Sequence, residues 1–174
     1  MAAIDPAIYE EMEISAETTD GSGKTIDLKL GVVKFNYYED LFSPTITAQM
    51  LIVSAGGATK TNERGEGTDV LDTVYSGLPI RGGERVRIRI KPNSNTNIPL
   101  EFDTPEKYFY VSNVARQFSD GSKEIFTLDL VSREAITNET SRVVRRYPKE
   151  SKISDHVKTI ITEALASTIE DRDI

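Results

Sequence analysis

The chain has 174 residues, of which 38% are hydrophobic and 28% are charged, a length and balance typical of a single folded domain. It contains no cysteine and one histidine, His156, which excludes disulfides, thiolate catalysis and cysteine-bound zinc and leaves little material for a histidine-based active site. The formal net charge of −7 opposes attraction to phosphate backbones, so free nucleic acid is not an expected partner.

The first predicted strands are a bent strand and its antiparallel return. Apolar side chains fall at every second position from Ile26 to Val32, including Leu30, the spacing of a strand with one buried face. The alternation slips by one residue after Val32 and continues through residues 33–37, which predicts a β-bulge at the slip. A second alternating run at residues 46–52 ends at a Gly-Gly pair and predicts the return strand.

The middle of the chain predicts a long loop, a short strand and a hairpin. Residues 55–67 are rich in Gly, Thr, Asn and charge and have no apolar period, so we expect a loop there, followed by one helical turn within residues 69–75. Apolar and basic residues alternate most regularly at residues 86–90, which predicts a strand with one buried face. Residues 107–118 and 124–132 flank a Ser-Asp-Gly-Ser turn and predict a β-hairpin.

Two helices are predicted after the last strand. The apolar period lengthens there to helical spacing through Val143 and Val144, and Pro148 closes the segment. A second helix is predicted to begin at Ser154 as its N-cap, with an apolar stripe along one side of residues 153–165. No later element covers that stripe, so we expect either a fragment of a longer protein or a partner on the stripe.

Two groups of basic residues are the candidate partner interface. Arg85, Arg87 and Arg89 alternate along one strand and place positive groups on one face, which suits an anionic partner surface. A solvated strand face that resists aggregation explains the same pattern equally well. Arg145 and Arg146 belong to a second basic cluster, for which we favour an intersubunit or solvated role over contact with nucleic acid.

No catalytic, cofactor-binding or metal site is predicted. Neighbouring carboxylates, as at residues 10–13 and 39–40, point apart on a strand and diverge on a helix, so a solvated face is favoured over a glycosidase pair or a metal site. His156 is expected on the surface of the last helix, off its apolar stripe. Because no apolar run approaches the roughly 18 residues of a membrane helix and residues 1–8 lack a signal core, neither a membrane partner nor a cleaved signal peptide is expected. We therefore expect a protein that is not an enzyme and uses no cofactor.

Five stretches of the sequence follow one another in a recognisable order. They are IDLKLGVVKFNYYEDLF, ITAQMLIVSA, GLPIRGGERVRIRI, YFYVSNVARQFSDGSKEIFTLDLVSREAI and RRYPKESKISDHVKTIITEAL. In this order they resemble the start of the baseplate hub protein of contractile-tailed bacteriophages, over most of residues 25–166. The most telling part is residues 82–90 followed by the Asp-Gly hairpin turn.

The alternating runs predict a mainly β fold with short helices (β+α). The resemblance implies that it is a tail-tube-type antiparallel β-barrel or sandwich at residues 25–146, after an N-terminal segment at 1–24. A linker and helix at 147–174 would then begin a following domain. It also implies a structural virion protein of the tail baseplate, assembled in the host cytoplasm, which joins the tail tube protein to the central spike protein through ring-forming barrels. The family has two barrels per subunit and forms trimers, so we expect a trimeric homo-oligomer, although this chain holds one barrel. DNA is then only passing cargo in the lumen.

Two other functions fit some of the residues. A cell-wall carbohydrate-active tail domain would use acidic residues, because carboxylates alone can cleave glycosides, and it would need two facing carboxylates. A nucleic-acid-binding barrel would use the basic strand together with Tyr108, Phe109 and Tyr110 as a stacking surface. The net charge of −7 opposes this last reading.

Overall fold

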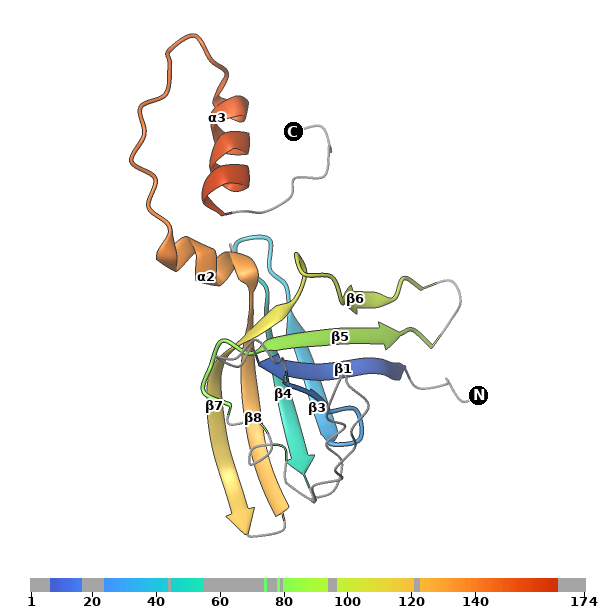
Figure 1. The fold of residues 1–174 in the computed structure, drawn as a ribbon. Coiled ribbons are helices and arrows are strands. Elements are labelled where there is room, and N and C mark those ends of the chain that lie inside the picture. Colours follow the sequence, from blue (N-terminus) through green and yellow to red (C-terminus); the bar gives the residue numbers. More distant parts are fainter. Residues whose placement is uncertain are drawn as a thin grey trace.

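In a computed structural model the strands form one antiparallel sheet that curls into a half-barrel (Figure 1). The structure describes residues 7–16, 24–43, 45–54, 74, 78, 80–93, 97–120 and 123–165, without the side chains at 24, 116, 117, 119 and 120. The strands are β1 (Ile8–Ala16), β2 (Lys24–Asp27), β3 (Val32–Tyr38), β4 (Thr47–Ser54), β5 (Arg85–Lys91), β6 (Leu100–Phe102), β7 (Phe109–Asp120) and β8 (Lys123–Ser132). The helices are α2 (Arg133–Thr140), α3 (Ile153–Thr159) and the π-helical turn η1 (Ile160–Ala164). The predicted mainly β fold with short helices is confirmed.

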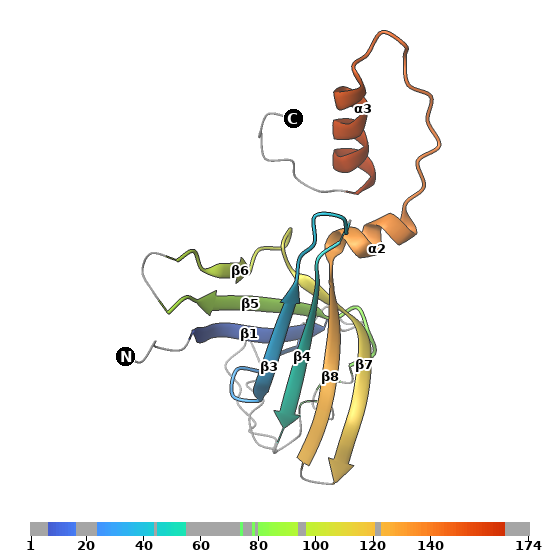
Figure 2. The ribbon, with the colours of Figure 1, turned by 180° about the vertical axis from the view of Figure 1, so that it is seen from behind.

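The sheet folds into two layers that cross each other. The strand order is β2-β1-β5-β7-β8-β4-β3, and β6 pairs with the end of β5. Figures 1 and 2 show β1 and β5 running across the direction of β3, β4, β8 and β7. The layers join where β5 meets β7, and this pairing holds only two residue pairs, Arg85 with Tyr110 and Val86 with Phe109.

The chain between β2 and β3 connects the layers on the other side. The Leu28 amide donates to the Met12 carbonyl of β1 at 2.7 Å, and the Gly31 carbonyl accepts from the Val53 amide of β4 at 2.8 Å. A Cβ at Gly31 would lie 2.9 Å from the Val53 carbonyl oxygen, so only glycine allows this approach. Four residues therefore pass from one layer to the other.

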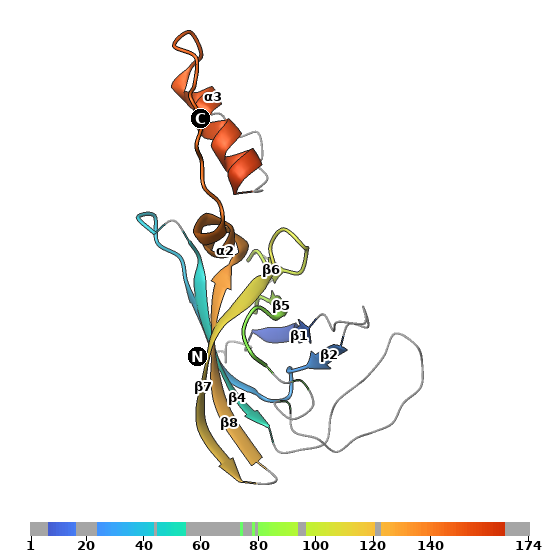
Figure 3. The same ribbon diagram turned by 60° about the vertical axis from the view of Figure 1, so that its left-hand side comes forward.

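The core lies between the two layers. Every second side chain of the central strands points inward, as the two-residue period of a strand requires. Figure 3 shows the layer of β1, β2 and β5 beside the layer of β4, β7 and β8. The most deeply buried large side chains are Met12, Ile14, Ile26, Leu28, Met50, Ile52, Leu78, Ile88, Phe109, Phe126, Leu128 and Leu130.

The predicted bent strand is divided in two. The bulge after Val32 is confirmed by a register shift between Val32 and Lys34. The prediction that Leu30 shares the buried face was wrong, because its side chain is 93% exposed. A turn lifts it outward, since the amides of Gly31 and Val32 both donate to the Leu28 carbonyl, at 2.9 and 3.1 Å.

Two strands had no counterpart among the predicted elements. β1 lies within the segment assigned to residues 1–24, yet it pairs with both β2 and β5 and buries Met12 and Ile14 completely. β6 is three residues long and pairs with β5. The division into 1–24, 25–146 and 147–174 stays a prediction, with β1 a member of the sheet.

The hairpin of β7 and β8 is confirmed, whereas the helices after it differ from expectation. The first helix ends at Thr140, and Ser141 is already extended at φ −98 and ψ 141, so Val143 and Val144 lie outside it. Two adjacent β-branched residues favour this extended backbone. The second helix begins earlier than predicted, with Lys152 rather than Ser154 at the N-cap position.

Two predictions concern segments that lie wholly or mostly outside the described residues. The loop at 55–67 lies outside the described residues, and of the helical turn at 69–75 only Val74 is described.

Candidate interaction surfaces

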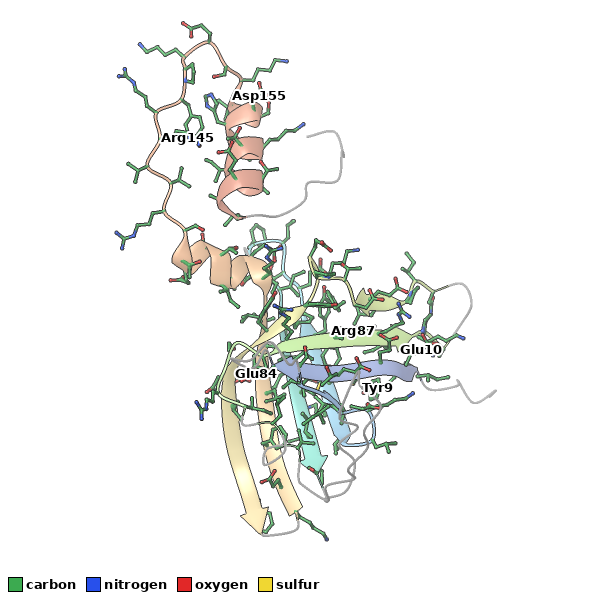
Figure 4. The ribbon with its side chains drawn as sticks, viewed as in Figure 1. Tyr9, Glu10, Glu84, Arg87, Arg145 and Asp155 are labelled. Carbon is green, nitrogen blue, oxygen red and sulfur yellow. The ribbon has the colours of Figure 1, made fainter. Side chains whose placement is uncertain are left out.

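The basic ladder of β5 is engaged in ion pairs with its neighbouring strands. Register places Arg87 opposite Glu13 and Arg89 opposite Glu11 on β1, and Arg89 opposite Glu101 on β6. Arg87 bonds the carboxylates of Glu11 and Glu13 through its two Nη atoms, at 2.6 and 3.4 Å. Arg89 bonds Asp103, and its Nη1 lies 3.5 Å from Glu11. Figure 4 shows Arg87 and Glu10 on this part of the sheet.

The network carries more negative than positive charge. It consists of Arg87, Arg89 and Lys91 with Glu10, Glu11, Glu13, Glu101 and Asp103, a net charge of −2. The hydrogen bond and charge of Asp103 hold the pKa of Arg89 above its ordinary value. That Arg85, Arg87 and Arg89 contact an anionic partner stays a prediction, but the guanidinium groups of Arg87 and Arg89 are already matched by carboxylates within the sheet.

A tight turn fixes the start of β5 at the corner between the layers. Gly82 and Gly83 have φ values of +107° and +89°, which side-chain-bearing residues rarely adopt. The buried Glu84 carboxylate accepts the amides of Arg81 at 2.7 Å and Gly82 at 2.9 Å. Glu84 (labelled in Figure 4) therefore has a structural role, which is to hold the turn that brings β5 onto β7.

On the outer face of the four-stranded layer β3-β4-β8-β7, side-chain amides donate hydrogen bonds to a carboxylate. The two oxygens of Asp129 on β8 each accept an amide hydrogen at 2.9 Å, one from Gln49 on β4 and one from Asn113 on β7. These bonds tie three strands together across the face. These two side-chain hydrogen bonds therefore fix the register of β8 against both β4 and β7.

Both outer edges of this layer are open within the part of the chain that the structure describes. β3 pairs with β4 alone. β7 touches β5 only at its start, and from Ser112 to Asp120 it pairs with β8 alone. Each open edge presents a row of backbone donors and acceptors to another chain.

The segment from Ser141 to Leu165, named here the C-terminal unit, folds back on itself. An extended stretch runs beside α3 and η1, joined by a 2.8 Å bond from the Ser141 hydroxyl to the Ala164 carbonyl and by a 2.6 Å ion pair between Arg145 and Glu163. Figure 4 shows Arg145 opposite the helix. His156 is half-buried rather than on the open surface, because it stacks on Tyr147 with ring centroids 4.5 Å apart and bonds Ser151 at 2.6 Å.

Part of the apolar surface of this unit is exposed, whereas Ile160, Ile161, Ala164 and Leu165 of the predicted stripe are half-buried. α3 and η1, both fully described, contain no buried residue, and Ile153 and Val144 are 80% and 94% exposed. A pocket of about 330 Å³ opens between the extended stretch and the helix. Its lining is mixed, with Val143, Val144, Tyr147, Ile160 and Ala164 beside Ser141, Arg142, Arg145, Thr159 and Glu163.

Tyr37 should ionise later than an ordinary tyrosine. Burial, and then the 2.8 Å hydrogen bond to Glu39 and its charge, raise the pKa of Tyr37 from 10.0 to about 12. Because the folded value is the higher one, the neutral phenol stabilises the fold below pH 10.0, and this contribution is lost as the pH rises through about 12. Alkaline titration of tyrosinate absorbance, compared with Tyr37→Phe, should isolate this late transition among the seven tyrosines. Glu39→Gln should move it to lower pH, and a Tyr37 transition at or below pH 10.0 would contradict the assignment.

Neither a metal site nor a known relative supplies a function. Among the described residues no group of three or more His, Asp or Glu side chains is placed to hold a metal ion. None of the helices in the described ranges has the length and apolar character needed to span a bilayer. Comparison of the chain with protein-family models, with curated proteins and with solved structures found no match, so its function has to be inferred from its own geometry.

Proposed function

We propose that this chain is a structural subunit that assembles with copies of itself into a ring, and that the ring serves as a baseplate hub joining a tail tube to a central spike. The observation that carries the assembly is the pair of open edges on the four-stranded layer, β3 on one side and β7 on the other. A sheet with two open edges can be extended at both by the same kind of subunit. Such a heterologous contact closes into a ring when the rotation between subunits permits.

Strand direction supports this pairing. The layer contains three antiparallel steps, from β3 to β4, from β4 to β8 and from β8 to β7, so β3 and β7 run in opposite directions. Subunits related by rotation about an axis along the strands keep their direction. The β3 edge of one subunit then meets the β7 edge of the next as an antiparallel pair, and the sheet continues around the ring with its own hydrogen-bond pattern.

The β3 edge carries little of the protection that keeps edge strands apart in monomers, although its register shifts between Val32 and Lys34 and that of β7 shifts twice. β3 contains no proline, Lys34 is its one charged residue, and Val33 and Tyr38 are 63% and 54% exposed. Edge strands of monomeric proteins are commonly blunted by proline, charge or covering segments. An edge with one charged residue and exposed apolar side chains suits pairing in an assembly.

The hub role rests on the order of the sequence phrases and agrees with the half-barrel fold. In this role the expected oligomer is a trimer, its partners are the tail tube protein and the central spike protein, and DNA passes through the lumen without being bound. The subunit has no chemistry of its own. The carboxylates of Glu11, Glu13 and Asp103 are bound to arginines, which does not favour the alternative of a carbohydrate-cleaving pair.

The assembly is tested by mass and hydrogen exchange on the same samples. Light scattering after size exclusion should show the mass rise toward three copies as concentration increases. The backbone amides of β3 and of β7 beyond Ser112 that point away from β4 and β8 should exchange at least about tenfold more slowly in the oligomer than in the monomer, whereas the paired amides of the same strands are protected in both. A monomer at every concentration, or an oligomer with unchanged exchange along β3 and β7, would refute the proposed assembly.

A further inference from the structure

Two apolar side chains stand fully outside the fold at the tip of the β3–β4 hairpin. Leu41 and Phe42, named here the knob, are each 93% exposed. The turn that carries them is ordered by hydrogen bonds, because the Phe42 amide donates to the Asp40 carboxylate at 2.9 Å and the Ser43 amide donates to the Asp40 carbonyl at 3.0 Å. A turn held in this way presents the knob in a defined place, which lowers the entropic cost of docking it.

We propose that the knob of one subunit docks into the pocket of the C-terminal unit of a second copy of this chain. The pocket of about 330 Å³ has a mixed lining, in which Val143, Val144 and Ile160 offer apolar contact to Leu41 and Phe42 beside the polar groups of Arg142 and Thr159. In the described structure the knob is exposed, so it does not fill the pocket of its own chain. This inference rests on the proposed ring and names a second contact between its subunits.

Charge favours the same pairing. Glu39 and Asp40 precede the knob, and neither forms an ion pair with any described residue. Arg142 lines the pocket and Arg146 follows it in the extended stretch, and these two likewise have no ion pair among the described residues. Because Arg145 and Glu163 of the lining pair with each other, Arg142 is the lining charge that an acidic tip can meet, and such a charge match guides two surfaces together.

The positions of knob and pocket fit neighbours within one ring. β4 begins at the level where β8 ends, because Thr47 pairs with Val131 and the Ser132 amide donates to the Ile46 carbonyl at 2.9 Å. Since α2 and the C-terminal unit follow β8, the hairpin tip and the unit lie toward the same end of the layer (Figure 2). Rotation about an axis along the strands then carries the tip of one subunit toward the unit of the next without a shift along that axis.

Disulfide trapping tests the contact, because the chain has no cysteine of its own. Ser43→Cys places a thiol beside the knob and leaves both knob residues intact, and Val144→Cys places one in the pocket. When the two single variants are mixed under mild oxidation, a heterodisulfide between them should form at least tenfold faster than between Leu30→Cys and Val144→Cys. Leu30 is the matched control, since it is also 93% exposed but lies at the opposite end of β3. Adding Leu41→Ser and Phe42→Ser to the Ser43→Cys variant should reduce the rate to that of the control.

The outcomes separate this contact from the ring itself. Equal rates for the Ser43 and Leu30 variants, in a sample that light scattering shows to be oligomeric, would overturn the knob contact and leave the ring in place. A fast heterodisulfide in a protein that forms no ring would support the contact between copies and overturn the ring. A chain carrying both Ser43→Cys and Val144→Cys that closes internally, while the mixed single variants give no heterodisulfide, would identify the tip of the same chain as the occupant and overturn the proposal.

Discussion

Truncating Phe109 to alanine should lower the free energy of unfolding by about 3–5 kcal/mol, a large part of the roughly 5–15 kcal/mol that stabilises a domain of this kind. The ring is 1% exposed and stands 4.6 Å from that of Phe102, centroid to centroid. Phe109 also occupies one of the two residue pairs by which β7 meets β5. Its removal leaves a cavity where the layers join, and the backbone bonds that remain there do not replace the lost apolar contact.

Phe118→Ala is the matched control, because it makes the same chemical change on the same strand at a side chain that is 49% exposed. Its effect should stay within about 0.5 kcal/mol when unfolding by denaturant is measured at a concentration where the protein is monomeric. Similar losses for the two variants would show that the corner is not the weak point of the barrel.

Ile14→Ala should destabilise the chain by about 2–5 kcal/mol, although it lies in the segment that the sequence separated from the barrel. Ile14 is completely buried and pairs with Ile26 on β2 and Val86 on β5. Truncation removes packing from both neighbours at once. Denaturant unfolding of the isolated monomer measures the effect.

Ile8→Ala makes the same change in the same strand at a side chain that is 56% exposed, and it should cost no more than about 0.5 kcal/mol. If Ile14→Ala proved as mild as Ile8→Ala, β1 would be a peripheral arm rather than a strand of the barrel. The difference between the two variants is therefore the quantity to measure.

Strands were predictable where the alternation of apolar residues was continuous. β4 and β5 carry such runs, and the residues that the pattern placed inward are buried except Ile90, which is half-buried. β1 was not predicted because its alternation of apolar and polar residues is interrupted. Its register shifts between Tyr9 and Glu11, and three of its nine residues are glutamates. In hindsight Met12, Ile14 and Ala16 carry the signal, but only for half of the strand.

The candidate site was only partly predictable. The alternation of Arg85, Arg87 and Arg89 placed them on one face, as the structure has them, but their nearest charges were invisible in the linear order. Glu11 and Asp103 lie far from Arg89 in the sequence and reach it through the pairing of β5 and the path of the chain after β6. The exposure of Leu41 and Phe42 could not be predicted, because the sequence of a turn does not show whether its apolar side chains point into the core or into solvent.

The mainly β class, the central hairpins and the alternating strand faces could be predicted, because each follows from residues close together in the chain. Three features could be seen only in the folded chain: β1 pairs within the sheet, carboxylates match Arg87 and Arg89, and β3 and β7 present edges of opposite direction that no described strand covers. These features depend on which distant strands lie side by side, and strand order and register are set by packing of the whole sheet rather than by local pattern.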